Sequence, residues 1–295
     1  MSFSPAGKVY EDTAIFIHRL SKGKIVEEWR AGSGLAELTQ QHLGQERIEH
    51  ERVDRELQVA RDIQLGSLPE GVPNLPDWQI DSYCQPAREV GGDFYEFYQL
   101  GNGRVGFVVG DATGKGVPAA IVTTATAAYL GAVAAASDSS PGEALALANE
   151  ALFARIPPNM FVTCFYAILE PESASLTYAN AGHDLPYLYR NGNAEELRAR
   201  GMPLGIMPGM SYEEGEISLA EGNCVLFHSD GLVEAHNPRG EMFGFPRLRA
   251  LVAEHGEERT LRNLLLEELY SFVEEGWEQE DDITLLTLRR SVDRG

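Results

Sequence analysis

The sequence of 295 residues has little positive charge: 24 Lys and Arg stand against 45 Asp and Glu, a formal net charge of −21. A surface of that sign repels a phosphate backbone and an anionic lipid surface, so binding to nucleic acid or to a membrane is disfavoured. Two interpretations of the acidic excess stay open. Either all of the carboxylates are solvated, or a few of them bind cations.

Cysteine is also scarce, and Cys84, Cys164 and Cys224 lie far apart among apolar residues. None has a His or Cys at metal-ligand spacing, so we interpret them as small core hydrophobes of a protein in the reducing cytoplasm. The N-terminus lacks the charged and then apolar pattern of a signal peptide. The longest apolar run, residues 117–136, is rich in Ala and interrupted by Thr and Tyr, which predicts a buried helix and no membrane span.

Three segments differ in composition. Residues 1–42 carry the pattern of a short β-hairpin with a turn at Ser21-Lys-Gly-Lys. Residues 43–70 are predicted to be a charged helical linker, and residues 71–295 a larger domain. One apolar stripe follows the linker helix at Val53, Leu57, Ala60 and Ile63. The stripe fits either a helix packed on its own domain or a signalling linker that pairs with a second copy in a homodimer.

The larger segment contains short apolar strands and helices grouped in blocks. That grouping favours an α+β sandwich over a doubly wound parallel fold. We predict strands at 79–85, 94–100, 105–110, 162–169, 176–181, 186–189, 224–228 and 283–288, and helices at 118–136, 141–154, 247–254 and 260–275.

Two glycine motifs do not indicate a nucleotide site. The stretch Gly101-Asn-Gly-Arg-Val-Gly106 has dinucleotide-binding spacing, but a strand-like segment follows it where a helix is required. It is typical of a hairpin turn. The pair Gly114-Lys115 lacks both the earlier Gly and the following Ser or Thr of a P-loop.

The hairpin turn predicts where two aspartates meet. If residues 101–103 form a three-residue loop, Leu100 pairs with Arg104, and counting back along both strands puts Asp93 opposite Asp111. Directly opposed residues have Cβ atoms about 5 Å apart, and like charges there are destabilising unless something neutralises them.

A similar layout recurs near the C-terminus. One strand leads to Asp230, and another begins after the pair Asp281-Asp282. If these strands are antiparallel neighbours, four or five carboxylates converge at one edge of a sheet. All-oxygen ligation suits Mg²⁺ or Mn²⁺. Two such ions would activate a water held between them and clamp a phosphoryl group.

These residues lie in stretches that resemble a known family. From about Glu56 to Arg290, the chain is similar to the bacterial PPM-type, metal-dependent serine/threonine phosphatases of the stage II sporulation protein E and stress-sigma-factor regulator branch. The matching stretches, in the order of that family, are ELQVARDIQLGSLP, VGGDFYEFYQL, VVGDATGKGVPAAIV, LTYANAGHDLPYL, GMPLGIM, LFHSDGLVEAHNPRGEMFG and DDITLLTL.

The resemblance implies a two-sheet antiparallel β-sandwich flanked by helices, with two Mn²⁺ or Mg²⁺ ions at one edge. Carried over by motif, Asp93 and Asp111 are ligands and catalytic residues, Asp111 is the bridging ligand, and the Ala112 carbonyl assists. Asp230 and Asp281 hold the other ion, and Asp282 is the less favoured member of its pair.

The implied reaction is hydrolysis of a phosphoserine or phosphothreonine on a partner protein, which in this branch is typically an anti-sigma-factor antagonist. The attacking group is a water that bridges the ions. The helix after Gly116 is implied to be a switch element that orders the metal site, with the linker helix passing a signal into it. A catalytically silent module that binds the same partner is the alternative.

Three neighbouring residues stay without a firm role. Thr113 stands where many animal relatives have a His as the candidate general acid, so the group that protonates the leaving oxygen is unassigned. Lys115 fits either a phosphate-steering or a loop-capping role. His183, in Asn-Ala-Gly-His, is expected to support loops and not to bind metal. Separately, residues 1–42 weakly resemble the C-terminal end of a SnoaL-like domain; an unrelated hairpin is the alternative.

Overall fold

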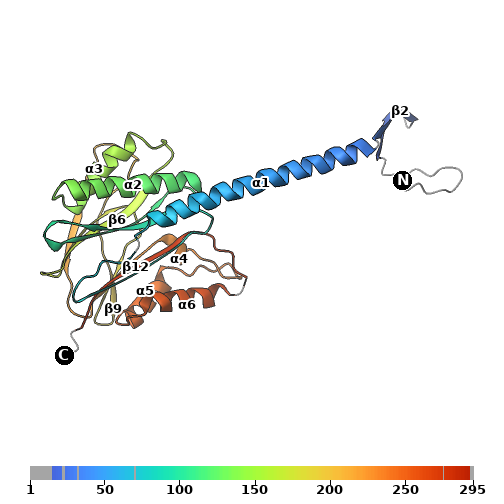
Figure 1. Ribbon diagram of the computed structural model, residues 1–295. Coiled ribbons are helices and arrows are strands. Elements are labelled where there is room, and N and C mark those ends of the chain that lie inside the picture. The colour runs from blue at the N-terminus through green and yellow to red at the C-terminus, as the bar shows by residue number, and fades with distance from the viewer. Residues whose placement is uncertain (1–14, 22–23, 32, 70, 275, 293–295) are drawn as a thin grey trace. The chain divides into compact units, whose positions relative to one another are not determined.

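The computed structural model describes residues 15–21, 24–31, 33–69, 71–274 and 276–292 (Figure 1). The chain divides into two compact units, residues 1–58 and 59–295. In the first unit, β1 (Ile15–Ser21) pairs antiparallel with β2 (Lys24–Ala31), with a bulge between Arg19 and Leu20. The expected hairpin turn falls partly outside the described residues. The likeness to a SnoaL-like domain stays a prediction.

Helix α1 (Ser33–Ser67) is longer than the sequence pattern predicted, because it begins at Ser33 and not near residue 43. The residues before 43 include good helix formers, and Gly44 does not end the helix. Along its exposed middle part, Arg47 pairs with Glu51, and Arg52 pairs with Glu49 and Glu56. Such pairs support a solvated helix by a few tenths of a kcal/mol each, about 0.2–0.5.

The second unit contains two five-stranded sheets. Their strand orders are β10-β7-β6-β5-β4 and β3-β12-β11-β8-β9, and every pair of neighbours is antiparallel. The predicted α+β sandwich is therefore confirmed. The first sheet is formed by β4 (Asp93–Gln99), β5 (Val105–Ala112), β6 (Val162–Glu170), β7 (Ser175–Ala181) and β10 (Glu214–Ser218), and the second by β3 (Trp78–Gln85), β8 (Tyr187–Arg190), β9 (Asn193–Glu196), β11 (Cys224–His228) and β12 (Ile283–Arg290).

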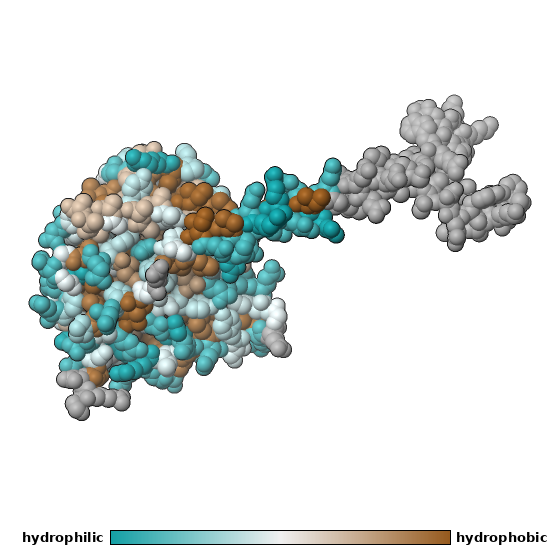
Figure 2. Space-filling model, viewed as in Figure 1, coloured by the Kyte–Doolittle hydropathy of each residue, from teal (hydrophilic) through white to brown (hydrophobic). Residues whose placement is uncertain are grey.

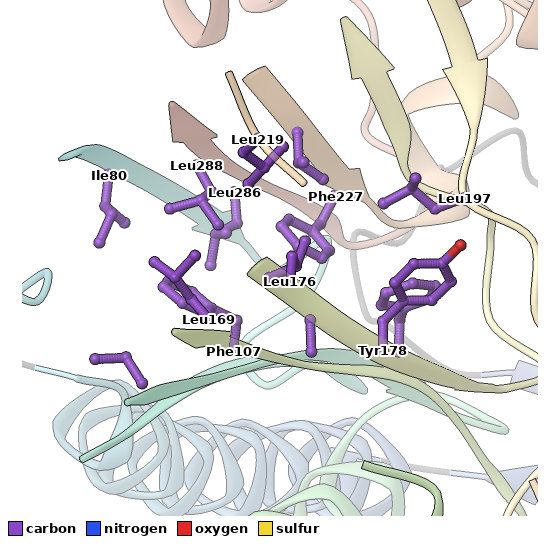
Figure 3. Packing of buried hydrophobic residues seen from close by; sticks show 14 of the residues in the cluster. Ile80, Phe107, Leu169, Leu176, Tyr178, Leu197, Leu219, Phe227, Leu286 and Leu288 are labelled. Atoms are coloured by element: carbon purple, nitrogen blue, oxygen red, sulfur yellow. The ribbon is translucent and has the colours of Figure 1, made fainter. Parts of the chain in front are cut away.

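The two sheets pack face to face around an apolar core. Figure 3 shows Phe107 and Leu169 of the first sheet facing Leu286 and Leu288 of the second, with Phe227 further along the same layer. Phe165, from β6, packs edge-on against Phe227 with ring centroids 5.8 Å apart. This layer holds the two sheets, and therefore their edges, in a fixed relation.

Helices cover the outer faces of both sheets (Figure 1). Helices α2 (Val117–Ala136) and α3 (Pro141–Phe153) lie on the first sheet, and α5 (Phe245–His255) and α6 (Leu261–Val273) on the second. Strands β5 and β6 are consequently buried on both faces, which explains their almost continuous apolar sequence. The sequence patterns missed the short, polar strands β9 and β10 and the four-residue helix α4 (Asp230–Val233).

Helix α2 is less buried than its composition predicted. Ala119, Val122 and Leu130 face the sheet, but Ile121 on the opposite side is 64% exposed. Figure 2 shows apolar surface over this helix. By length and composition α2 is the one candidate membrane span among the described residues, with 28% of its most apolar window buried. Helix α2 is a surface helix because one of its faces packs on the first sheet and the opposite face is exposed.

Candidate metal centre

The hairpin β4–β5 brings the first two carboxylates together. Residues Gly101–Gly103 form its loop, the N–H of Leu100 donates to the carbonyl of Arg104 (2.9 Å), and Asp93 is the register partner of Asp111. The register predicted from the glycine motif is therefore confirmed. Asp93 begins β4 and is 5% exposed, and Asp111 is the next-to-last residue of β5.

The second pair of strands brings the other acidic residues to the same edge. Strand β11 pairs antiparallel with β12, as expected, and Asp230 opens α4 just after β11. The backbones approach closely there, because a Cβ on Gly231 would lie 2.0 Å from the carbonyl oxygen of Asp282. The hydroxyl of Ser229 donates to that same carbonyl (3.2 Å), which ties the two segments together.

The carboxyl groups at this edge have raised pKa values, in part because they repel one another. Burial raises the pKa of Asp93 well above its usual range, and the charges of Asp111 and Asp282 raise it further. Burial, followed by the charges of Asp230, Asp281 and Asp282, raises the pKa of Asp111 to about 8. For Asp230, burial and then the charge of Asp281 raise the pKa to about 6. The structure thus places these carboxylates close enough to oppose one another's ionisation.

The adjacent residues Asp281 and Asp282 have different partners. One oxygen of Asp281 accepts from the ammonium of Lys115 (2.9 Å). The carboxylate of Asp282 accepts three backbone N–H bonds, from Ala87 (2.7 Å), Gly92 (2.6 Å) and Asp93 (3.2 Å). Asp282 therefore holds the segment that leads into β4, and this contact is what positions Asp93.

The donor set fits hard divalent ions. The Oδ2 atom of Asp93 is buried and has no hydrogen-bond partner among the described residues. A Cβ on Gly92 would lie 2.6 Å from Asp111 Oδ1 and 2.8 Å from the Ala112 carbonyl oxygen, so a carboxylate and a carbonyl converge beside this glycine. Oxygens of these two kinds are the ligands that Mg²⁺ and Mn²⁺ prefer.

Within the described part of the chain, no three Asp, Glu, His or Cys side chains are already arranged to hold one ion. The contacts explain this, because Asp281 is turned to Lys115 and Asp282 to backbone N–H groups. An ion that used Asp281 as a ligand would have to take it from its present partner.

Further polar residues line a hollow of about 260 Å³ beside Asp111 and Asp230. Thr163, the β6 register partner of Asp111, contacts Nδ1 of His183 at 3.0 Å. The side chain of Asn180 contacts both backbone groups of His183. Its oxygen accepts the N–H of His183 (2.8 Å), and its amide donates to the carbonyl of His183 (2.9 Å). Thr163 comes to the site through the pairing of β5 with β6, which the sequence patterns did not predict.

His183 is a loop-supporting residue in this arrangement. Burial lowers the pKa of its imidazole to about 3, so the ring is neutral near pH 7. Its neighbour Asp184 also lines the hollow, and burial, then the charge of Glu234, raises the pKa of that carboxyl to about 6. These two side chains form the polar wall next to the acidic residues.

The fold is shared with solved phosphatase domains. The chain superposes on the SiaA-PP2C domain of Pseudomonas aeruginosa with a TM-score of 0.72 at 24% identity, covering 82% of this chain and 98% of that one. It also matches the RsbU and RsbW domains of Rv1364c from Mycobacterium tuberculosis, with a TM-score of 0.61 at 28% identity over 74% of this chain and 61% of that one. Two antiparallel sheets with helices on both outer faces and an acidic edge define a PP2C-type phosphatase domain.

Sequence comparison gives the family. Residues 101–291 match Stage II sporulation protein E (SpoIIE), and the chain belongs to that family. Phosphoserine phosphatase RsbU of Bacillus subtilis strain 168 is 28% identical over 88% of this chain and 77% of its own length. Protein IcfG of Synechocystis is 27% identical over 80% of this chain, which spans only 42% of that relative.

Proposed function

We propose that this chain is a metal-dependent serine/threonine phosphatase that acts on a phosphorylated partner protein, an anti-sigma-factor antagonist, in the cytoplasm. The observation that carries the proposal is the convergence of Asp93, Asp111, Asp230 and Asp281 at one edge of the sandwich, with a buried oxygen of Asp93 unpartnered among the described residues. Family membership and the name of RsbU support the reaction class. The three free cysteines support a reducing compartment.

In this proposal Asp93, Asp111 and the Ala112 carbonyl hold one of two ions, and Asp230 and Asp281 hold the other, with Asp111 shared. Asp281 is favoured over Asp282, because the Asp282 carboxylate already accepts three N–H bonds. When bound, Mn²⁺ or Mg²⁺ supplies charge neutralisation and activates water. A fold neighbour, RsbX, has been solved in complex with magnesium, and this supports the choice of ions.

The chain's own groups would shape the rest of the site. Thr163 and His183 line the hollow beside the ions without carrying negative charge at neutral pH, so these two side chains do not repel an anionic phosphoryl group. Asp282 fixes the entry to β4, and Ser229 fixes the start of α4. These contacts would hold the ligands in place before substrate arrives.

The test is an assay of the purified chain on an aryl phosphate and on a phosphorylated antagonist, with Mn²⁺, with Mg²⁺ or with a chelator. We expect turnover that requires the metal and is faster on the protein substrate. Binding of the phosphorylated protein without turnover in Mn²⁺ would favour the alternative, a catalytically silent interaction module. Turnover that survives the chelator would contradict the metal-dependent mechanism.

We also propose that α1 carries the activating signal and pairs with a second copy of itself. Val53 and Ile63, two members of the apolar stripe on this helix, are 40% and 67% exposed, so a second copy could cover them. Light scattering should show a dimer that Ile63→Glu converts to a monomer. A monomeric unsubstituted chain at all concentrations would contradict pairing.

A further inference from the structure

After residue 24 the sequence contains a single lysine, Lys115. Every other positively charged side chain in that part of the sequence, histidine aside, is an arginine. This single ammonium stands in the loop between the first pair of acidic residues and α2. Lysine differs from arginine in carrying a compact, strongly hydrated point charge, and in that respect it is the side chain closest to a small cation.

The contacts of Lys115 are made to the acidic edge itself. Its Nζ lies 2.9 Å from Asp281 Oδ2 and 2.7 Å from the carbonyl oxygen of Glu280. The other oxygen of Asp281 accepts the N–H of Asp282 (3.0 Å). Both oxygens of this carboxylate are therefore engaged, one of them by the ammonium.

The loop that carries Lys115 has few contacts around its two glycines. The residue stands between Gly114 and Gly116, both with positive φ (+96° and +76°), and a Cβ at either glycine would meet no other atom within 4 Å. Gly116 caps α2 without any side-chain hydrogen bond. On the other side, the N–H of Thr113 is fixed to the carbonyl of Phe161 (2.9 Å). Release of the ammonium would remove the side-chain contact that ties residues 114–116 to Asp281, while Thr113 stayed in place.

We propose that Lys115 is a resident counter-cation, which holds the Asp281 carboxylate when no divalent ion is present and is displaced from it when the ion binds. The inference rests on the proposed function, because it takes Asp281 as an ion ligand. It adds that ion binding and the position of the loop before α2 are coupled through one side chain. The ammonium and the ion compete for Asp281 Oδ2, so each weakens the other's hold on it.

The first test measures ion affinity directly. Calorimetric titration of the chelator-treated full chain with Mn²⁺ should give a Kd for the weaker site that is about two- to fivefold lower in Lys115→Met, the change expected for loss of a half-exposed competing ion pair. Lys115→Arg keeps the charge and should stay within about twofold of the unsubstituted chain. Arg104→Met is the matched control, because it removes one positive charge at the other end of the same β4–β5 hairpin and should leave the Kd unchanged.

The second test follows the ammonium. Reductive methylation with ¹³C-formaldehyde labels the lysines and keeps their charge, and the signal missing from Lys115→Met is that of residue 115. Titration with diamagnetic Mg²⁺ should shift this signal with the same midpoint as a calorimetric titration of the same chain with Mg²⁺, while the signals of Lys8, Lys22 and Lys24 stay in place.

An unchanged or higher Kd in Lys115→Met, or a residue 115 signal that does not move with Mg²⁺, would overturn the counter-cation role. A higher KM for the phosphorylated protein with an unchanged Kd would also overturn it and assign Lys115 to the phosphate. These results leave the phosphatase proposal intact if metal-dependent turnover is present. Failure of the unsubstituted chain to bind either ion would overturn both.

Discussion

The two halves of the acidic edge are held in different ways. On the β4–β5 side, Asp93 and Asp111 face each other because continuous strand pairing leads from a short loop to both of them. On the β11–β12 side, Asp230, Asp281 and Asp282 lie beyond the paired strand ends, and side-chain contacts decide where the carboxylates of Asp281 and Asp282 point. The first half is fixed by the main chain, and the second half contains one adjustable carboxylate, that of Asp281.

This difference gives the carboxylates of the two halves different properties: some are fixed in position, and one can exchange its partner. A carboxylate fixed by strand register stays in place whether or not an ion is bound, although burial and then repulsion raise its pKa. A carboxylate held by one ammonium is exchangeable, because a half-exposed ion pair contributes only about 0–1 kcal/mol. We therefore expect substitutions in the first half to remove function outright and those in the second half to separate stability from ion affinity.

The largest effect is expected from Asp111→Asn. The amide has the same shape but cannot neutralise two ions, so turnover should fall by more than the roughly 10–100-fold that loss of an outer-shell partner costs. In chelator, the substituted chain should unfold at the same or higher urea concentration, because a crowded buried charge is gone. Asp138→Asn, on the exposed partner of Arg104, is the control and should keep full activity. Near-normal turnover of Asp111→Asn would remove Asp111 from the ligand set.

The adjacent pair Asp281 and Asp282 gives the next effect. Asp282→Ala leaves three backbone N–H groups without their acceptor, so the free energy of unfolding in chelator should fall by about 2–4 kcal/mol. Asp281→Ala removes a half-exposed ion pair and should cost less than about 1 kcal/mol, while it weakens Mn²⁺ binding. Urea unfolding and calorimetry measure the two quantities. Equal losses of stability would show that the second half is as rigid as the first.

Strand register explains how much of the fold and site could be predicted from sequence. The loop at 101–103 is local, so counting along two strands placed Asp93 against Asp111 correctly. The long apolar strands β5 and β6 were likewise evident. Strands β9 and β10 were missed because they are short and polar, and the start of α1 was missed because the charged run that predicted this helix begins only after residue 42.

The remaining features of the site depend on contacts between distant segments. Asp282 holds residues 87–93 from nearly 200 positions away, and Lys115 reaches Asp281 across 166 positions. Neither the hydrophobic periodicity of a segment nor the spacing of a motif indicates such contacts. Thr163 entered the site only through its pairing with Asp111. Sequence therefore predicted which acidic residues meet, and the structure was needed to show what holds each one.

A smaller effect is expected from Gly92→Ala, which tests the rigidity of the first half. The new Cβ would lie 2.6 Å from Asp111 Oδ1 and 2.8 Å from the Ala112 carbonyl oxygen, and this carbonyl, which is backbone, cannot withdraw without disturbing the hairpin. Overpacking of this kind costs about 1–3 kcal/mol of unfolding free energy, and Mn²⁺ affinity should fall with it. Gly101→Ala, at the other end of the hairpin where a Cβ meets nothing within 4 Å, should change neither. Equal behaviour of the two variants would mean that the first half adapts.

The smallest effect separates burial from crowding as the cause of raised carboxyl pKa values. Glu96 lies on β4 three residues after Asp93, and burial raises its pKa to about 7, with no carboxylate among the causes. Its folded pKa is above the unfolded value of 4.5, so the stability linked to its proton is complete below pH 4.5 and is lost as the pH rises through 7. Glu96→Gln carries no such charge and should remove this loss.

Urea unfolding in chelator at pH 5 and pH 8 measures the difference. At pH 5 the substituted and unsubstituted chains should differ little, and at pH 8 Glu96→Gln should be more stable by about 1 kcal/mol, a figure reduced for the partial solvent exposure of Glu96. Asp111→Asn should also gain stability at pH 8, because its raised pKa includes repulsion by three other aspartates. If Glu96→Gln gained as much as Asp111→Asn, burial alone would account for both, and crowding would no longer distinguish the acidic edge from the rest of its strand.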